Sequence, residues 1–244
     1  MLPEPVKIGC VTLYNCDCVD LLKASEDSQF DLAICDPPYG MAGKWMSEDD
    51  PRTKVYGVTG LKAEETIEIN KWDIAPSEEY FFELKRISRN QIIWGANYFL
   101  EFLGSCKGPI IWDKERHGFV LADGEFAWTS FDKKPLRICK CGQRIKSADK
   151  KSAGGRWHKT QKPIFLYRWL LERYTKKGHK ILDTHLGSGT HAMACLDLGF
   201  ELTACEISEK YFNEAVKRIK KYYSSHEKLF DQSDSIKFIE EGLF

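Results

Sequence analysis

The stretch KILDTHLGSGTHAMACLDLGFELTAC, residues 180–205, decides the fold class. It contains, in order, an apolar strand, a glycine-rich turn, a helix and a second strand, which we expect over residues 180–182, 187–190, 191–198 and 201–205. A further helix is expected over residues 208–223, because Tyr211, Ala215 and Ile219 recur on one face. Strands that alternate with helices are typical of a parallel sheet, so the sequence predicts an α/β fold.

The rest of the chain supplies more strands and helices of the same kind. Short apolar runs predict strands over residues 10–15, 30–35, 91–94, 108–112 and 126–131. A helix is expected to start at Ser77, with Glu78 and Glu79 in its first turn, where negative charge suits the helix dipole. Another should run from Pro163 to Tyr174, since proline is tolerated at the first helical position.

Length and composition limit the class of protein. The 244 residues, 43% of them hydrophobic, suffice for one main core. No stretch approaches the roughly 18 apolar residues of a membrane span, and the N-terminus lacks the pattern of a signal peptide, so we expect a cytoplasmic protein without a membrane partner. An odd number of cysteines, nine, favours reduced thiols in that setting. The C-x-C spacings at residues 16–18 and 139–141 are weak zinc signals, so no metal is expected.

Charge is balanced overall but unevenly distributed. The net charge is zero, whereas residues 131–162 hold eleven Lys or Arg against Asp132 and Asp149. This stretch has few apolar residues and no clear period, so it predicts a basic insertion. Its charges could contact phosphates, or could form a solvated loop. The residues that we expect to contact DNA phosphates are Lys133, Lys134, Arg137, Arg144, Lys150, Lys151 and Arg156.

The glycine-rich turn predicts a nucleotide-like ligand. Gly187, Gly189 and Ala192 fit the spacing G-x-G-x-x-A between a strand and a helix, where small residues let the backbone approach a ligand. Glu206 ends the next strand, where a carboxylate can accept hydrogen bonds from ribose hydroxyls. The absence of a lysine directly after Gly189 argues against a P-loop. A nicotinamide oxidoreductase and a merely structural turn remain open on these residues alone.

A second motif, Asp36-Pro37-Pro38-Tyr39, directly follows the strand expected at residues 30–35. Two prolines restrict the backbone and remove two N–H donors, which leaves a rigid turn rich in acceptors. A carboxylate beside a free carbonyl can accept both hydrogens of an amino group, and Tyr39 offers a stacking face. A base flipped out of a duplex fits this description.

These motifs, in this order, resemble the beta class of DNA amino-methyltransferases. Further similarity lies in LYNCDCVDLL, IIWGANYF, IIWDK, ADGEFAWTSF, HKTQKP and EISEKYFNEAVKRI, so the resemblance covers nearly the whole chain, and some phage and prophage methylases are especially similar around ADGEFAWTSF. It implies a Rossmann-like mixed seven-stranded sheet with helices on both faces and a circularly permuted order of motifs. Residues 1–132 and 158–244 would form the catalytic and cofactor-binding halves of one domain, separated by a small basic target-recognition insertion at residues 133–157.

The resemblance also implies S-adenosylmethionine as cofactor. Its expected contacts are Asp17, Cys18, Asp36, His158, Lys159, Thr160, Pro163, Asp183, Thr184, His185, Gly187, Ser188, Gly189, Thr190, Glu206 and Ile207. The chain departs from the family at one point, because Thr184 and His185 stand where Pro and Phe usually follow the aspartate. His185 is therefore a candidate for the stacking contact that the aromatic ring would make.

Asp36, Pro37, Pro38 and Tyr39 are the expected catalytic residues, and double-stranded DNA is the expected partner. Relatives that methylate cytosine N4 more often carry serine at the first motif position, so Asp36 favours adenine N6. Cytosine N4 methylation is the nearest alternative, and a non-catalytic nucleic-acid-binding module is an alternative of another class. Such enzymes work in a bacterial or phage-infected cell, often within restriction-modification, and the sequence leaves monomer and homodimer equally open.

Overall fold

The computed structural model describes residues 1–40, 73–115, 122–142 and 161–230, with side chains described up to residue 226. One sheet organises these residues, and its nine strands lie in the order β1-β2-β9-β8-β3-β4-β6-β5-β7. Strands β2, β9, β8, β3 and β4 run parallel to one another, while β1 and β6 run antiparallel to their neighbours. The expected mixed α/β sheet is thus confirmed, with nine strands where the resemblance implied seven.

The strands are β1 (Val6–Ile8), β2 (Val11–Tyr14), β3 (Leu32–Cys35), β4 (Gln91–Trp94), β5 (Ile110–Asp113), β6 (Gly124–Thr129), β7 (Arg137–Lys140), β8 (Lys180–Asp183) and β9 (Glu201–Cys205). The helices are α1 (Cys18–Ala24), α5 (Glu78–Ile87), the 3-10 turn η1 (Ala96–Tyr98), α6 (Leu100–Leu103), α8 (Ile164–Tyr174), α9 (Thr190–Leu198) and α10 (Glu209–Phe230).

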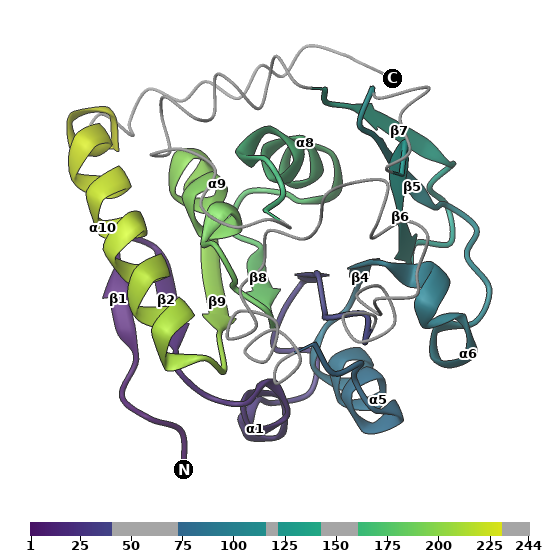
Figure 1. The fold of residues 1–244 in the computed structure, drawn as a ribbon, viewed down its shortest axis with the longest axis horizontal. Coiled ribbons are helices and arrows are strands. Elements are labelled where there is room, and N and C mark those ends of the chain that lie inside the picture. Colours follow the sequence, from purple (N-terminus) through teal and green to yellow (C-terminus); the bar gives the residue numbers. More distant parts are fainter. Residues whose placement is uncertain (41–72, 116–121, 143–160, 231–244) are drawn as a thin grey trace, which may run out of the picture.

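Helices cover both faces of the sheet, as Figure 1 shows. Helices α8, α9 and α10 pack on one face, and α1, α5 and α6 pack on the other. The central strands β9, β8, β3 and β4 therefore bury side chains in both directions. In β3, Leu32 and Ile34 join the core under α8 and α9, while Ala33 and Cys35 join the core under α5. This is why β3 is an uninterrupted apolar run rather than an alternating one.

The sequence misses two edge strands and three short helical segments, which are β1, β7, α1, η1 and α6. Strand β7 lies inside the stretch that we expected to be an irregular insertion, and it pairs with β5 from Ile110–Arg137 to Asp113–Lys140. Its Cys139 is buried, whereas the residues on either side of it are exposed. Pro163 occupies the N-cap of α8 rather than its first helical position. The domain boundaries stay a prediction.

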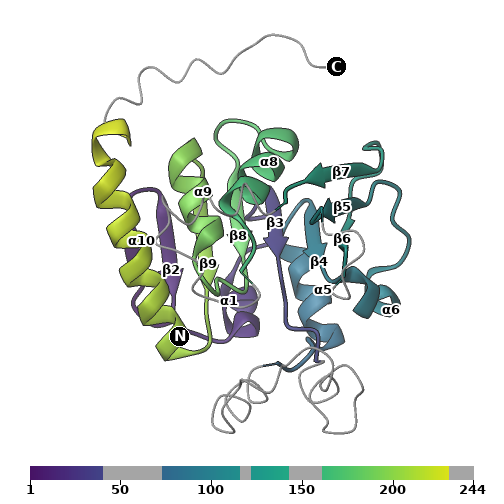
Figure 2. The same ribbon diagram turned by 45° about the horizontal axis from the view of Figure 1, so that its top comes forward.

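The strand register offsets β5, β7 and the first half of β6 along the strand direction relative to β3 and β4, which gives the sheet a step. Cys35 pairs with Ile93, and Trp94 pairs with Ala127, which in turn pairs with Ile110. Strands β5 and β7 thus begin level with the end of β4 and continue beyond it. The first half of β6 extends with them, and Figure 2 shows β5, β6 and β7 together at the right of the sheet. These strands form a wall beside the carboxyl end of β3.

In the part of the chain that the structure describes, no helix is long and apolar enough to cross a membrane. All nine cysteines are free thiols.

One polar contact joins the three helices of the first face. Asp197 on α9 accepts hydrogen bonds from Arg168 Nε on α8, at 2.8 Å, and from the Tyr222 hydroxyl on α10, at 2.8 Å. Asp197→Ala should lower the free energy of unfolding by about 2–3 kcal/mol, because it leaves a charged group and a buried hydroxyl without their acceptor. Asp132→Ala, which removes an exposed and solvent-screened partner of Lys107, should cost markedly less in the same urea titration. Equal losses in the two variants would contradict the assignment.

Candidate active site

Asp36 directly follows β3, and both of its carboxylate oxygens have partners within the protein. Oδ1 accepts a hydrogen bond from the Tyr39 hydroxyl at 2.9 Å, and Oδ2 lies 2.5 Å from Lys162 Nζ. The Asp36 side chain is 21% exposed, so it is accessible at one side only. Burial raises the pKa of Asp36 above its ordinary value, while Lys162 and the Tyr39 hydroxyl limit that rise.

Lys162 is a buried cation that bridges two carboxylates. Its side chain is 3% exposed, and its Nζ lies 2.5 Å from Asp36 and 2.9 Å from Glu125 on β6. Glu125 also contacts Lys114, at 2.7 Å, so two carboxylates and two ammonium groups balance one another. Burial disfavours the Lys162 charge, but Asp36 and Glu125 raise the pKa of Lys162 above its ordinary value. Burial acts to raise the pKa of Glu125, but Lys162 and Lys114 outweigh it and lower that pKa to about 2.

The step in the sheet explains how Glu125 reaches this position. Glu125 precedes Ala127 by two residues in β6. It therefore lies on the part of β6 that projects past the end of β4, where it pairs with Trp112 of β5. Lys162 stands immediately before Pro163, at the N-cap of α8, and its Nζ lies 5.4 Å from the centre of the buried Trp94 ring. The cation is thus held by carboxylates from two elements and by an aromatic face, an arrangement that stabilises charge in a dry setting.

Tyr39 is fixed by aromatic neighbours and by one glycine. Its ring stacks on Tyr98 with centroids 4.9 Å apart and meets the edge of Phe99 at 6.1 Å. Gly95 lies so close that a Cβ atom there would come within 2.1 Å of Tyr39 Cε1, and its φ of 68° also favours glycine. Burial and the nearby Asp36 raise the pKa of Tyr39, so its hydroxyl stays protonated and donates to Asp36.

The glycine-rich turn lies on the neighbouring strand at the same edge of the sheet. The register Ala33–Leu182 places Asp36 and His185 at the same level, just past the ends of β3 and β8. Gly189 begins α9 and packs against α10, where an added Cβ would meet Ile219 at 2.8 Å. At Gly187 an added Cβ would have only the His185 carbonyl oxygen, at 3.8 Å, within 4 Å. The turn is therefore packed on one side and open on the other, as a ligand-binding loop requires.

Glu206 follows β9 and closes the turn from the other side. Its carboxylate accepts hydrogen bonds from Gly187 N and Ser208 N, each at 3.0 Å, and Asn15 Nδ2 holds its backbone oxygen at 2.8 Å. Burial raises the pKa of Glu206 above its ordinary value. Each carboxylate oxygen keeps acceptor capacity beyond its one backbone bond. The open face of Gly187 and this anchored acceptor fit an adenosine-bearing cofactor.

Asp183 and Thr184 each make two polar contacts that hold the segment between β8 and the turn. Asp183 is 2% exposed; it accepts from His185 N and lies 3.0 Å from His191 Nδ1. Thr184 Oγ1 contacts the Tyr80 hydroxyl at 2.7 Å and His185 Nδ1 at 2.9 Å. Burial lowers the pKa of His185 to about 4, so its imidazole is neutral at pH 7. The ring meets Tyr80 edge to face, and its stacking on a cofactor stays a prediction.

The other predicted site residues lie in several places. Asp17 caps α1 by accepting from Val19 N at 2.7 Å, Cys18 begins that helix, and Ile207 is 60% exposed. Ser188 and Thr190 contact each other through their hydroxyls at 2.6 Å in the turn. Lys133, Lys134 and Arg137 are exposed around the start of β7. Outside the described residues lie His158, Lys159, Thr160, Arg144, Lys150, Lys151 and Arg156.

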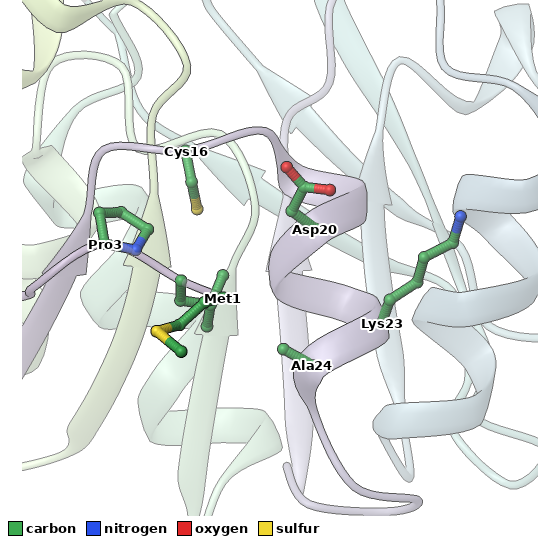
Figure 3. Close-up of a pocket in the computed structure, with 7 residues that line it drawn as sticks. Met1, Pro3, Cys16, Asp20, Lys23 and Ala24 are labelled. Carbon is green, nitrogen blue, oxygen red and sulfur yellow. The ribbon is translucent and has the colours of Figure 1, made fainter.

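The cavity drawn in Figure 3 lies apart from these motifs. It measures about 340 Å³ and is enclosed by the N-terminal residues, by Cys16 and by α1, including Asp20 and Lys23. Neither the D-P-P-Y motif nor the glycine turn lines it. Among the residues with described positions, no group of three or more His, Cys, Asp or Glu could hold a metal ion.

Lys162, Glu125 and Tyr98 are site residues that the sequence analysis did not single out. Each lay in a segment quoted for its resemblance, namely HKTQKP, ADGEFAWTSF and IIWGANYF. Only Glu125 gave a signal, as a charge inside the largely apolar segment of a predicted strand. Lys162 was obscured because it closes a run of eleven basic residues.

Comparisons with known proteins agree with this geometry. Residues 111–217 match a family model described as DNA methylase. The chain is 24% identical to the type II methyltransferase M.HinfI of Haemophilus influenzae, over 90% of this chain and 71% of that protein. The resemblance to the N4/N6 DNA amino-methyltransferases is confirmed.

Solved DNA methyltransferase structures share the fold. One match is the crystal structure of an M1.HpyAVI–SAM complex, with a TM-score of 0.54 and 19% sequence identity. The matched region covers 85% of this chain and 99% of the M1.HpyAVI chain. Another match is the cytosine-N4-specific PvuII DNA methyltransferase, with a TM-score of 0.56 and 12% sequence identity. The matched region covers 95% of this chain and 97% of the PvuII enzyme. These likenesses support the Rossmann-like fold expected of a DNA amino-methyltransferase.

The seat of Tyr39 yields a stability prediction for this methyltransferase fold. Gly95→Ala should destabilise the protein by about 1–3 kcal/mol more than Gly104→Ala, because a Cβ at residue 95 overlaps the Tyr39 ring. Gly104 is a matched control, since its φ of 75° is also positive and nothing lies within 4 Å of its added Cβ. Thermal or urea unfolding of both variants measures the difference, and equal destabilisation would show that the ring is not seated there.

Proposed function

We propose that this protein transfers a methyl group from S-adenosylmethionine to the exocyclic N6 of an adenine flipped out of duplex DNA. The confirmed resemblance supports the coarser activity, which is methylation of an exocyclic base nitrogen. The observation that carries the proposal is the Asp36 carboxylate, anchored by Lys162 and Tyr39 beside the glycine turn. A protein that methylates bacterial DNA in this way works where that DNA lies, in the cytoplasm.

The turn between β8 and α9 fits the cofactor. Gly187 presents open space, and Glu206 offers an acceptor to the ribose hydroxyls. Ser188 and Thr190 supply hydroxyls to the methionine end of the cofactor. Bound there, S-adenosylmethionine supplies an electrophilic methyl group on a positively charged sulfur.

Asp36 and the Pro37 carbonyl would act on the target amine. The lone pair of an adenine amino nitrogen is conjugated into the ring, so the nitrogen is a poor nucleophile. Two acceptors that each accept a hydrogen bond from one N–H of the amine favour a tetrahedral nitrogen, whose lone pair can then point at the methyl group. After the methyl group arrives, the positively charged nitrogen would lose a proton to water, so Asp36 needs no strong basicity, only an ionised and oriented carboxylate.

Adenine is favoured over cytosine by the first motif residue and by the aromatic wall. Asp36 stands where cytosine-N4 relatives more often carry serine. Tyr39 and Tyr98 stack on each other, and together they make an aromatic surface whose area suits a purine. Cytosine N4 is the second candidate, and the fold likeness to the cytosine-N4-specific PvuII enzyme keeps it in the test.

The activity and its base are tested by nucleoside mass spectrometry of duplex DNA treated with the protein and S-adenosylmethionine. We expect N6-methyladenine with the wild type. Asp36→Ala should reduce it at least about tenfold, because a hydrogen bond to a charged group is worth about 1.5–3 kcal/mol in orienting the amine. S-adenosylmethionine should still protect Asp36→Ala against thermal unfolding, because most of the expected cofactor contacts remain.

Other outcomes separate the alternatives. N4-methylcytosine alone would overturn the base and keep the reaction class. No methylation, with thermal protection by NAD rather than by S-adenosylmethionine, would favour an oxidoreductase. DNA binding without methylation under any condition would favour a non-catalytic module. Near wild-type turnover in Asp36→Ala would overturn the catalytic assignment.

The basic stretch is proposed to contact DNA phosphates. Arg137 is level with Asp36 in the sheet register, and β7 is four strands from β3, a span of about 19 Å at ~4.8 Å per strand. That distance is shorter than one duplex turn of about 34 Å. A duplex whose base enters the site could therefore pass along this edge.

Replacement of Lys133, Lys134, Lys150 and Lys151 by Ala should flatten the dependence of DNA affinity on salt. Each lost phosphate contact removes about 0.9 from the slope of log affinity against log salt, so the slope should fall by up to about 3–4. Lys176 and Lys177 are exposed and precede β8, at the opposite edge of the sheet. Their replacement by Ala is the control and should leave the slope unchanged. Unchanged slopes in both variants would place the duplex elsewhere.

A further inference from the structure

The contacts of Lys162 do not resemble those of a surface lysine. Its side chain is 3% exposed, although it closes a basic stretch whose described members are otherwise exposed. Neighbouring residues of HKTQKP are expected near the cofactor, but the Lys162 ammonium faces Asp36 and Glu125. It therefore contacts the residue that the proposed function assigns to the target base.

We infer that Lys162 is a positioning residue for methyl transfer, which holds Asp36 through Oδ2 so that Oδ1 faces the incoming amine, with Glu125 opposing it as a counter-charge. The inference rests on the proposed function for the role of Asp36. A buried lysine from the segment before α8 thus sets the orientation and the charge state of the Asp36 carboxylate, which directly follows β3.

The two oxygens of Asp36 are bonded to groups of different strength. The Oδ2 contact joins opposite charges at 2.5 Å in a buried setting, whereas the Oδ1 contact is a neutral tyrosine hydroxyl at 2.9 Å on a half-buried ring. A base amine can share or replace the Tyr39 hydrogen bond at lower cost than it could displace Lys162. Rotation of the carboxylate would break the stronger contact, so the geometry selects Oδ1 for the amine.

The groups that face Asp36 shift its pKa in opposite directions, so replacing different groups should have opposite effects on that pKa. Lys162 and the Tyr39 hydroxyl favour the ionised carboxylate, and Glu125 disfavours it. Lys114 acts indirectly through Glu125, and the buried Tyr167 ring lies near both Asp36 and Lys162 and stays neutral. Lys162→Met should therefore raise the pKa of Asp36, while Glu125→Gln should lower it.

The direct test is the titration of the Asp36 carboxyl carbon by NMR, in full-length protein labelled with ¹³C at aspartate and assigned with Asp36→Asn. We expect the titration to move to higher pH in Lys162→Met and to lower pH in Glu125→Gln, with the double variant between them. Lys23→Met is the matched control, since it removes a lysine from an exposed pair with Glu79 at 2.6 Å. It should leave the titration unchanged.

Methylation kinetics give the second readout. In Lys162→Met we expect kcat to fall about tenfold or more, the acid limb of its pH profile to follow the shifted titration, and thermal protection by S-adenosylmethionine to persist. Glu125→Gln should move that limb to lower pH, and this arm holds even if Lys162→Met does not fold. An equal loss at every pH, or an Asp36 titration that does not move, would overturn the inference. A wild type without methyl transfer would refute the proposed function while the titration still tests the contact.

Discussion

The contact on which the site depends is one buried ammonium group between two carboxylates. Lys162 joins three elements that are remote in sequence: the end of β3, the projecting end of β6 and the segment that leads into α8. Removal of one partner from a buried ion pair typically costs about 3–5 kcal/mol, because the other charge stays in a poor solvent. Lys114 completes the balance at Glu125. The arrangement is therefore held as a set, and Asp36 is no freer to move than the core around it.

The sheet assigns different tasks to adjacent strands. Strand β3 carries the carboxylate, β8 carries the glycine turn, and their parallel register brings both to one edge at the same level. Tyr80 on α5 holds the segment after β8 through the contact of its hydroxyl with Thr184. Asp183 and His191, both buried, fix the start of the turn. Loops that look irregular in sequence are thus positioned by rigid elements, which is what a reaction needing alignment within tenths of an ångström requires.

The sequence was sufficient where a local pattern determined the outcome. Strands β4 and β9 were predicted with their observed bounds, because each is a short, largely apolar run that lies between turn residues. Strand β7 was missed because its exposed Arg137, Ile138 and Lys140 show no local strand pattern, and only pairing with β5 stabilises it. Lys162 was missed for the same physical reason. Nothing near it in the chain indicates burial, since both of its carboxylates come from other parts of the sequence.

The bridging lysine also bears on the choice of base. A hydroxyl at the first motif position would need no counter-charge, whereas a buried carboxylate needs a cation to remain ionised. In this chain the two features occur together, because Lys162 faces Asp36 at 2.5 Å and is itself excluded from water. Glu125 and Lys114 then serve to keep that cation neutralised and in place. Three further charges, all largely buried, thus support one ionised acceptor. The proposed preference for adenine rests on the carboxylate at this motif position, and the charge network keeps that carboxylate ionised through contacts that the motif alone does not contain.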